Sequence, residues 1–210
     1  MYPIVDLTES FEDNSFQWKQ KRTICWHWDG ATSARIAIRW QNERLKGEGT
    51  VVYNYIIGRD GTIFKMIDPL IRYAHHTGKG IAYDMTCIGI AISSKGYSDH
   101  FSDAQMKAAL QLRNEIFEIF DVTEEHSHHE LTPHKPDFPD HLWAEMLYYF
   151  KTNGHYRTKT SLYPTPSERI QVKDVPAAVD EYNMDVKLRK ARNKARRTAV
   201  RRQQYKAAVT

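Results

Sequence analysis

Ionisable side chains are concentrated in one short stretch, residues 128–139, which reads His-His-Glu-Leu-Thr-Pro-His-Lys-Pro-Asp-Phe-Pro. This stretch holds three histidines, two carboxylates and a lysine within twelve residues. Its prolines at 133, 136 and 139 forbid a continuing helix and predict a stiff, extended loop. Two imidazoles, or an imidazole and a carboxylate, can supply two or three zinc ligands from such a loop. A solvated polar loop with surface histidines would have the same composition, so the stretch alone leaves both interpretations open.

Any further metal ligand must come from elsewhere in the chain, because the stretch does not have the helical His-Glu-x-x-His spacing of many metalloproteases. A candidate is His27, near the end of the run 23–28 (Thr-Ile-Cys-Trp-His-Trp), whose β-branched and aromatic residues predict a strand. Taken alone, a histidine at that position is better explained as a packed sheet residue. Its chemical importance depends on the partners that the chain supplies.

The elements that position these residues follow from local patterns. Residues 51–57 and 63–66 predict two strands joined by an Asp-Gly turn at 60–61, a strong hairpin signal. The apolar run 87–92 predicts a strand buried on both faces. Helices are expected over 34–46, ended by Gly47; from the capping box of Ser102 and Gln105 to about 120; and over 140–151. The glycine-rich segment 74–80 is predicted to be a mobile loop. Each helix has residues expected to face the protein core. They are Ile36, Trp40 and Leu45 on the first helix; Met106, Ala109, Leu112, Ile116 and Phe120 on the second; and Leu142, Trp143, Met146 and either Tyr149 or Phe150 on the third.

Length and composition indicate one domain of ordinary size with an appendage, because the chain has 210 residues and is 41% hydrophobic. No apolar run approaches the roughly 18 residues of a membrane span. The polar, acidic residues 1–21 hold no apolar segment of the kind found in a secretory signal peptide. Cys25 and Cys87 lie in apolar runs and are expected to be buried thiols in a reducing compartment, although a single bridge between them stays open.

Charge is distributed unevenly along the chain. From Lys187 to the end there are ten basic residues and no acidic one, whereas the other 186 residues carry 20 basic and 26 acidic side chains. Beyond Pro176, which suits the first turn of a helix, alanine, arginine and lysine dominate, and these are good helix formers. We therefore expect an acidic domain followed by a cationic helical tail, whose partner would be a polyanion: an anionic outer-membrane lipid surface, a teichoic polymer or nucleic acid. A solvated helix, or one that docks on the acidic domain, is the simpler alternative.

Taken in order, these pieces resemble the zinc-dependent N-acetylmuramoyl-L-alanine amidases of the type 2 (peptidoglycan recognition protein) superfamily, and most of all the lysozyme-amidases (endolysins) of lytic phages. The resemblance covers about residues 20–150. It is carried by the strand with His27, the segments 53–62 (Tyr-Asn-Tyr-Ile-Ile-Gly-Arg-Asp-Gly-Thr), 88–90 (Ile-Gly-Ile) and 101–106 (Phe-Ser-Asp-Ala-Gln-Met), and the stretch 128–139.

The resemblance implies an α/β fold: a central mixed β-sheet flanked by helices, to which the basic helical extension is added at the C-terminus. It also sets the expected domain organisation. Residues 1–20 would be an N-terminal extension, 21–153 the zinc amidase domain, 154–175 a linker and 176–210 the basic tail.

The resemblance also assigns the site. His27, His128 and Asp137 match the three zinc ligands, Tyr53 and Lys135 match the catalytic residues, and His76 falls in the loop that touches substrate. The phage relatives carry a cysteine where this chain has Asp137, but an aspartate is a competent zinc ligand. The chain also has an additional residue, His134, before Lys135, which makes His134 a rival ligand, and Asn54 stands where relatives have a histidine after the tyrosine.

The activity implied is hydrolysis of the amide between N-acetylmuramic acid and L-alanine of peptidoglycan by zinc-activated water, in a phage endolysin expected to be a monomer. The endolysin would be made in the host cytoplasm and reach the periplasm or cell wall after release, through a holin, or would act from outside as part of the virion. The alternatives are a recognition module that binds muropeptide without cutting it, and an amidase with a regulatory or nucleic-acid-binding role in its tail. Superfamily members that only bind typically lose the third ligand, so Asp137 favours the enzyme.

Overall fold

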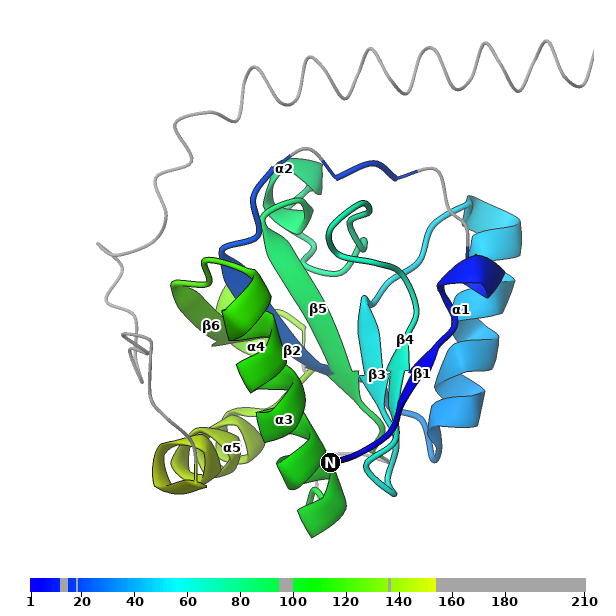
Figure 1. Ribbon diagram of the computed structural model, residues 1–210. Coiled ribbons are helices and arrows are strands. Elements are labelled where there is room, and N and C mark those ends of the chain that lie inside the picture. Colours follow the sequence, from blue (N-terminus) through cyan, green and yellow to red (C-terminus); the bar gives the residue numbers. More distant parts are fainter. Residues whose placement is uncertain (12–14, 18, 95–99, 136, 154–210) are drawn as a thin grey trace, which may run out of the picture. The chain divides into compact units, whose positions relative to one another are not determined.

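The fold is built on a six-stranded mixed sheet with the strand order β1-β4-β3-β5-β2-β6 (Figure 1). A computed structural model describes residues 1–11, 15–17, 19–94, 100–135 and 137–153. The strands are β1 (Ile4–Asp6), β2 (Thr23–Trp28), β3 (Tyr55–Ile57), β4 (Ile63–Lys65), β5 (Cys87–Ile92) and β6 (Glu124–Ser127). β3, β5, β2 and β6 run parallel to one another, whereas β3 and β4 form an antiparallel hairpin. The α/β class and the mixed central sheet expected from the sequence are confirmed.

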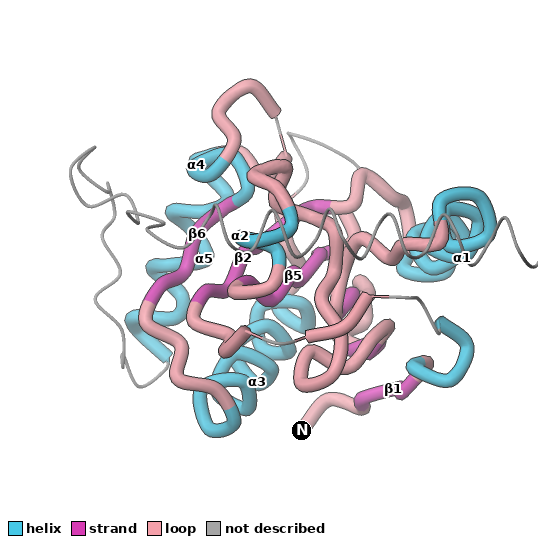
Figure 2. The backbone as a smooth tube through the Cα atoms, turned by 90° about the horizontal axis from the view of Figure 1, so that it is seen from above, coloured by secondary structure: helices cyan, strands magenta, loops and turns pink. Residues whose placement is uncertain are grey.

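Helices cover both faces of the sheet. Figure 2 separates α1 (Ala34–Glu48), on one side, from α3 (Asp103–Ile119) and α5 (Asp140–Asn153), on the other. Side chains alternate across each strand, so that Trp26 and Ile90 pack with α3 and α5, while Ala91 and Ile56 pack on the α1 side. Three shorter helices complete the described chain: a 3₁₀ turn at Thr8–Phe11, α2 (Ile81–Asp84) and α4 (His128–Leu131). Within the described ranges, no helix combines the length and apolar character needed to cross a membrane.

Most of the predicted elements occur where the sequence placed them. The Asp-Gly hairpin joins β3 to β4, β5 is buried along its whole length, and the capping box of Ser102 and Gln105 opens α3 with both of its hydrogen bonds formed. Cys25 and Cys87 are buried free thiols on adjacent strands. The strand predicted over 51–57 is shorter than expected, since only its last three residues form β3.

Helix α1 differs from its prediction in its end and in its buried face. It continues through Gly47 to Glu48, and Gly49 caps it in the left-handed conformation (φ 71°), donating its N–H to the carbonyl of Leu45. The buried residues of α1 are Ala34, Ala37 and Gln41, whereas Trp40 is 44% exposed. Small residues let the helix lie close to the sheet, and this turns the large Trp40 outward.

Two predicted loops differ from their predictions. Residues 124–127 form the edge strand β6, and 128–131 form one helical turn, α4, where the prolines had predicted an extended loop. The first proline comes only at 133, which leaves room for a turn before it. In the glycine-rich segment predicted to be mobile, Ala74, His76 and Thr77 are buried.

The N-terminal extension also contributes to the sheet. β1 pairs with β4 in parallel, in the register Ile4↔Ile63 to Asp6↔Lys65. With only three residues, all of them exposed, β1 has no hydrophobic periodicity by which it could be predicted. The predicted linker 154–175 and basic tail 176–210 lie outside the described residues.

Candidate active site and metal centre

Two histidines meet at the carboxyl ends of adjacent parallel strands. The pairing of β2 with β6 places Trp26 opposite Ser127. The residues that follow these two, His27 and His128, therefore also lie side by side. Their ring centroids are 4.4 Å apart, and both side chains are buried. A parallel register thus brings together residues that are about a hundred positions apart in sequence.

Local capping decides which histidine of the pair 128–129 points inward. Ser127 is the N-cap of α4: its hydroxyl accepts from the N–H of Glu130 (3.2 Å), and the Glu130 carboxylate accepts from the N–H of Ser127 (2.9 Å). This capping box starts the helical turn at His128. His129 consequently faces away, where its ring nitrogens lie 2.9 Å from Asp140 Oδ1 and 3.0 Å from the carbonyl of Pro133.

The third member of the cluster, Asp137, is anchored from both sides. Its Oδ1 accepts from the backbone N–H of Trp28 (2.7 Å), the last residue of β2. The next residue, Phe138, is fully buried against Phe101 and Trp143 and adopts a left-handed backbone conformation (φ 61°). Such a conformation costs a bulky residue on the order of 1–3 kcal/mol, and burial of the ring holds it in place. The carboxylate is therefore fixed at the strand end rather than free to move with its loop.

His27, His128 and Asp137 have the geometry of a metal site. Asp137 Oδ2 lies 2.8 Å from His27 Nδ1 and 2.7 Å from His128 Nδ1, and one ligand atom from each residue falls within 4.8 Å of the other two. Burial raises the pKa of Asp137, but the neighbouring His27 and the hydrogen bonds from both imidazoles outweigh it and hold the carboxyl pKa well below its usual range. Two imidazoles and a carboxylate suit zinc and leave a fourth position open, as catalytic zinc sites do.

A second group of possible ligands, Cys25, His27 and His76, shares His27 with the first. Cys25 is not part of the pocket lining, whereas all three residues of the first group are, so only the first group as a whole faces the space that a substrate could enter.

The outer nitrogens of both histidines face one short segment. His27 Nε2 lies 2.9 Å from His76 Nδ1, and His128 Nε2 lies 3.2 Å from the carbonyl oxygen of Thr77. Metal-binding histidines commonly donate their second ring N–H to such an acceptor, which fixes the ring and its tautomer. The ligand set and its surroundings thus fit a zinc ion.

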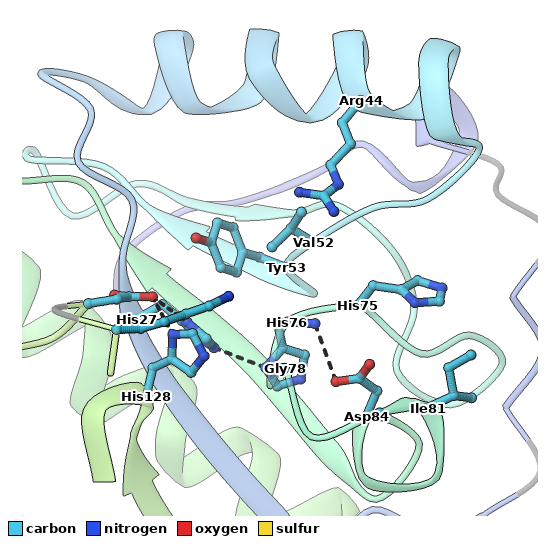
Figure 3. A pocket seen from close by; sticks show the side chains of 13 residues that line it. His27, Arg44, Val52, Tyr53, His75, His76, Gly78, Ile81, Asp84 and His128 are labelled. Atoms are coloured by element: carbon cyan, nitrogen blue, oxygen red, sulfur yellow. Dashed lines mark hydrogen bonds and ion pairs between the residues drawn. The ribbon is translucent and has the colours of Figure 1, made fainter. Parts of the chain in front are cut away.

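The cluster forms one end of an open pocket of about 530 Å³ (Figure 3). Tyr53 lies beside His27, with ring centroids 5.1 Å apart, and Lys135 reaches the pocket from the loop after α4. Burial raises the pKa of the Tyr53 hydroxyl well above its usual value, so it keeps its proton at neutral pH and can donate a hydrogen bond. Arg44 extends from α1 into the same space. The pocket is lined by His27, Arg44, Val52, Tyr53, His75, His76, Gly78, Gly80, Ile81, Asp84, His128, Lys135 and Asp137.

Residues 17–145 match the family model described as N-acetylmuramoyl-L-alanine amidase. The chain belongs to this amidase family. The matched segment contains the histidine–aspartate cluster, Tyr53 and Lys135.

Solved structures share the amidase fold at low sequence identity. The chain is similar to the Drosophila peptidoglycan recognition protein SA, with TM-score 0.60 and 18% identity, over 79% of this chain and 97% of that chain. It is also similar to the N-acetylmuramoyl-L-alanine amidase LysC from Clostridium intestinale, with TM-score 0.53 and 16% identity, over 74% of this chain and 100% of that chain. A third neighbour is peptidoglycan recognition protein LE in complex with tracheal cytotoxin, with TM-score 0.57 and 12% identity, over 79% and 98% of the two chains. A comparison with curated proteins gives no match.

The structure brings the predicted amidase residues into one pocket, with differences in how they face it. His27, His128, Asp137, Tyr53, Lys135 and His76 all line it. The rival ligand His134 is exposed and is not part of this lining. His76 is only 4% exposed and has its ring against His27, so most of it is turned away from the space that a substrate would occupy.

Sequence reasoning missed three residues of the site: Thr77, Asp84 and Arg44. Thr77 faces His128 through its backbone carbonyl, which carries no residue-specific signal. Asp84 binds the backbone of His76 and Thr77, contacts that no local sequence pattern reveals. Arg44 is one charge among several on an amphipathic helix, and only the packing of α1 on the sheet shows that it enters the pocket.

Proposed function

We propose that this protein is a zinc-dependent N-acetylmuramoyl-L-alanine amidase that hydrolyses the amide between N-acetylmuramic acid and L-alanine in peptidoglycan. One observation carries the proposal: in a chain of the amidase family, His27, His128 and Asp137 present converging ligand atoms at the end of an open pocket. A module that only binds muropeptide has no need of a complete ligand set with an open fourth position.

His27, His128 and Asp137 would hold the zinc ion, which supplies Lewis-acid chemistry by polarising the amide carbonyl and lowering the pKa of water. The side chains around it would then handle charge and protons. Lys135 would place its ammonium group near the oxygen that becomes negative during attack, the kind of contact that stabilises a transition state. Tyr53, whose hydroxyl keeps its proton, would hold the attacking water by a hydrogen bond or pass on a proton.

Arg44 suggests how the peptide would lie. It lines the pocket together with Tyr53 and the ligand cluster, and its guanidinium pairs with Glu48 (3.0 Å), one helical turn further along α1. A guanidinium is suited to a carboxylate, and peptidoglycan stem peptides carry carboxylates. We place the stem peptide toward Arg44 when the scissile amide is at the ligand cluster.

We further propose that the protein is a phage endolysin, a role supported by the resemblance of its ordered motifs to those of lytic-phage amidases. In this role it acts on the wall after release from the host cytoplasm.

The activity is tested with purified protein, zinc and purified peptidoglycan. We expect new free amine without new reducing ends, and loss of the amine signal when a chelator removes the metal. His27→Ala, His128→Ala and Asp137→Ala should each abolish amine release, while the exposed His134→Ala serves as the matched control and should retain zinc.

Two results would contradict the proposal. Tight binding of muropeptide with no amine release by the zinc-loaded protein would identify a recognition module. Loss of zinc in His134→Ala but not in His128→Ala would mean that His134, and not His128, is the zinc ligand.

A further inference from the structure

The metal-ligand histidines have a competing hydrogen-bond partner. In both rings the nitrogen that would bind the metal, Nδ1, lies within 2.8 Å of Asp137 Oδ2. A proton on Nδ1 would bond well to this carboxylate, but it would block the ligand lone pair. The carboxylate therefore favours the tautomer that cannot bind zinc, unless something on the other side of each ring favours Nε2–H.

Residues 76 and 77 supply that counterweight. His76 Nδ1 can accept from His27 Nε2–H, and the carbonyl of Thr77 can accept from His128 Nε2–H. Two consecutive residues of one loop thus face the outer nitrogens of both histidine ligands.

Asp84 holds this loop in place. A single oxygen, Oδ1, accepts from the Thr77 hydroxyl (2.7 Å) and the Thr77 N–H (2.9 Å). It also accepts from the His76 N–H (3.3 Å; Figure 3). Asp84 is 4% exposed, and Thr132 adds a hydroxyl bond to the same Thr77 carbonyl (2.8 Å). Burying a carboxylate is costly, and the three donors offset part of that cost while they fix the positions of His76 and Thr77.

The His76 ring packs directly against the backbone of strand β5 at Gly89. A Cβ atom at Gly89 would lie 2.8 Å from Cγ and 3.0 Å from Nδ1 of His76, closer than carbon atoms normally approach. The ring therefore rests directly on the strand backbone, and its distance to His27 is set by the sheet.

We propose that His76, Thr77 and Asp84 form a positioning loop that holds His27 and His128 in the tautomers able to bind zinc. This inference rests on the proposed zinc site and gives His76 a role other than substrate contact. The loop would act on metal affinity without touching the reacting atoms.

The test measures zinc affinity by competition with a chromogenic chelator, with Zn²⁺ as the only added ligand. Loss of such a partner typically weakens metal binding by roughly 10- to 100-fold, and we expect that loss for His76→Ala and Asp84→Ala. His76→Gln, whose amide oxygen can still accept from His27, should bind zinc within about threefold of wild type. His100→Gln is the matched control and should leave affinity unchanged, because His100 is exposed, pairs with Glu145 of α5 (3.1 Å) and is not part of the pocket lining.

Nitrogen-15 NMR of the histidine rings in the zinc-free protein gives a second readout. Wild type should show His27 mainly as Nε2–H, and His76→Ala should shift it toward Nδ1–H. Wild-type affinity in His76→Ala, an unchanged tautomer, or a His76→Gln variant as weak as His76→Ala would each overturn the inference. Failure of the wild-type protein to bind zinc would instead overturn the proposed function.

Discussion

The charge of Lys135 acts on the same imidazole that would hold the metal. Burial has the largest effect on the pKa of His27 and lowers it, Asp137 opposes that effect, and Lys135 adds to it. The side chain of Lys135 is exposed, but it lies close enough to the cluster to stabilise negative charge there. Removing one donor to a developing oxyanion typically costs roughly 10² to 10³ in rate.

We expect Lys135→Ala to lose about that factor in kcat while it retains zinc and muropeptide binding, and Tyr53→Phe to behave similarly. Turnover and zinc content are measured on the same samples. Lys79→Ala is the control, since Lys79 is an exposed lysine of a neighbouring loop outside the pocket lining. If Lys135→Ala turns over at nearly the wild-type rate with its metal in place, the assigned role is wrong.

A second lysine makes stability depend on pH. Lys21 is 1% exposed, its Nζ donates to the carbonyls of Cys87 (2.8 Å) and Asp84 (3.2 Å), and burial lowers its pKa to about 7. Because the unfolded chain holds this proton up to a pKa of about 10.4, folding releases it between these values. The stability from this group is present in full above the unfolded pKa and is lost progressively as the pH falls from there to about 7.

We therefore predict that the free energy of unfolding of wild type, relative to Lys21→Met, rises by about 2 kcal/mol between pH 7 and pH 9. Denaturant titrations of both proteins at the two pH values provide the measurement. The difference between the two proteins cancels the other groups that titrate in this range. A difference that stays constant, or that falls with pH, would show that Lys21 keeps its charge when it is buried.

At the scale of the elements, α1 contributes one arginine to the pocket and holds another outside it. Arg44 lines the pocket and pairs with Glu48 at 3.0 Å, whereas Arg39 makes the equivalent pair with Glu43 at 3.8 Å and is not part of the lining. Both pairs span one helical turn and are well exposed. The helix thus provides its own control.

Arg44→Gln should raise KM about three- to fivefold for a muropeptide with free stem-peptide carboxylates, with kcat little changed, as expected for a partly exposed charge pair worth up to about 1 kcal/mol. Arg39→Gln should not change KM. Glu48→Gln frees the guanidinium and should lower KM slightly. The comparison is repeated with an amidated peptide, on which the effect of Arg44→Gln should shrink; an equal effect on both peptides would refute recognition of a carboxylate.

Local patterns predicted the elements well where a specific interaction leaves a signature. The Asp-Gly hairpin, the capping box at Ser102 and the wholly apolar β5 all occur as expected. The capping box of Ser127 and Glu130 has the same signature, and its recognition would have predicted α4 and the inward turn of His128. Trp40 was misplaced because helical periodicity identifies an apolar face but not how closely that face approaches the sheet.

The ligand cluster could be assembled from the ordered resemblance of motifs, but its supporting contacts could not. His76 meets His27 across 49 positions and the Thr77 carbonyl meets His128 across 51, and each contact depends on the register of parallel strands. A backbone carbonyl carries no residue-specific signal. The buried Lys21 was missed for a related reason: its partners are two carbonyls, so nothing in the sequence marks it as buried.

At the scale of the whole molecule, the distribution of charge divides the chain into an acidic part and a strongly basic C-terminal segment. The ten basic residues from Lys187 onward lie outside the described part of the chain. A run of positive charge with no counter-charge is attracted to a polyanion, and salt weakens this attraction because the Debye length shortens from about 10 Å at 0.1 M to about 3 Å at 1 M.

Deleting residues 187–210 should therefore leave hydrolysis of a small soluble muropeptide unchanged and weaken binding to, and lysis of, intact cells at low salt. The deficit should shrink as salt rises, because screening removes the same attraction from the full-length protein. A tail in which the ten basic residues are replaced by glutamine separates charge from length and should behave like the deletion. Equal lysis by full-length and truncated protein at every salt concentration would leave the tail without a role in reaching the substrate.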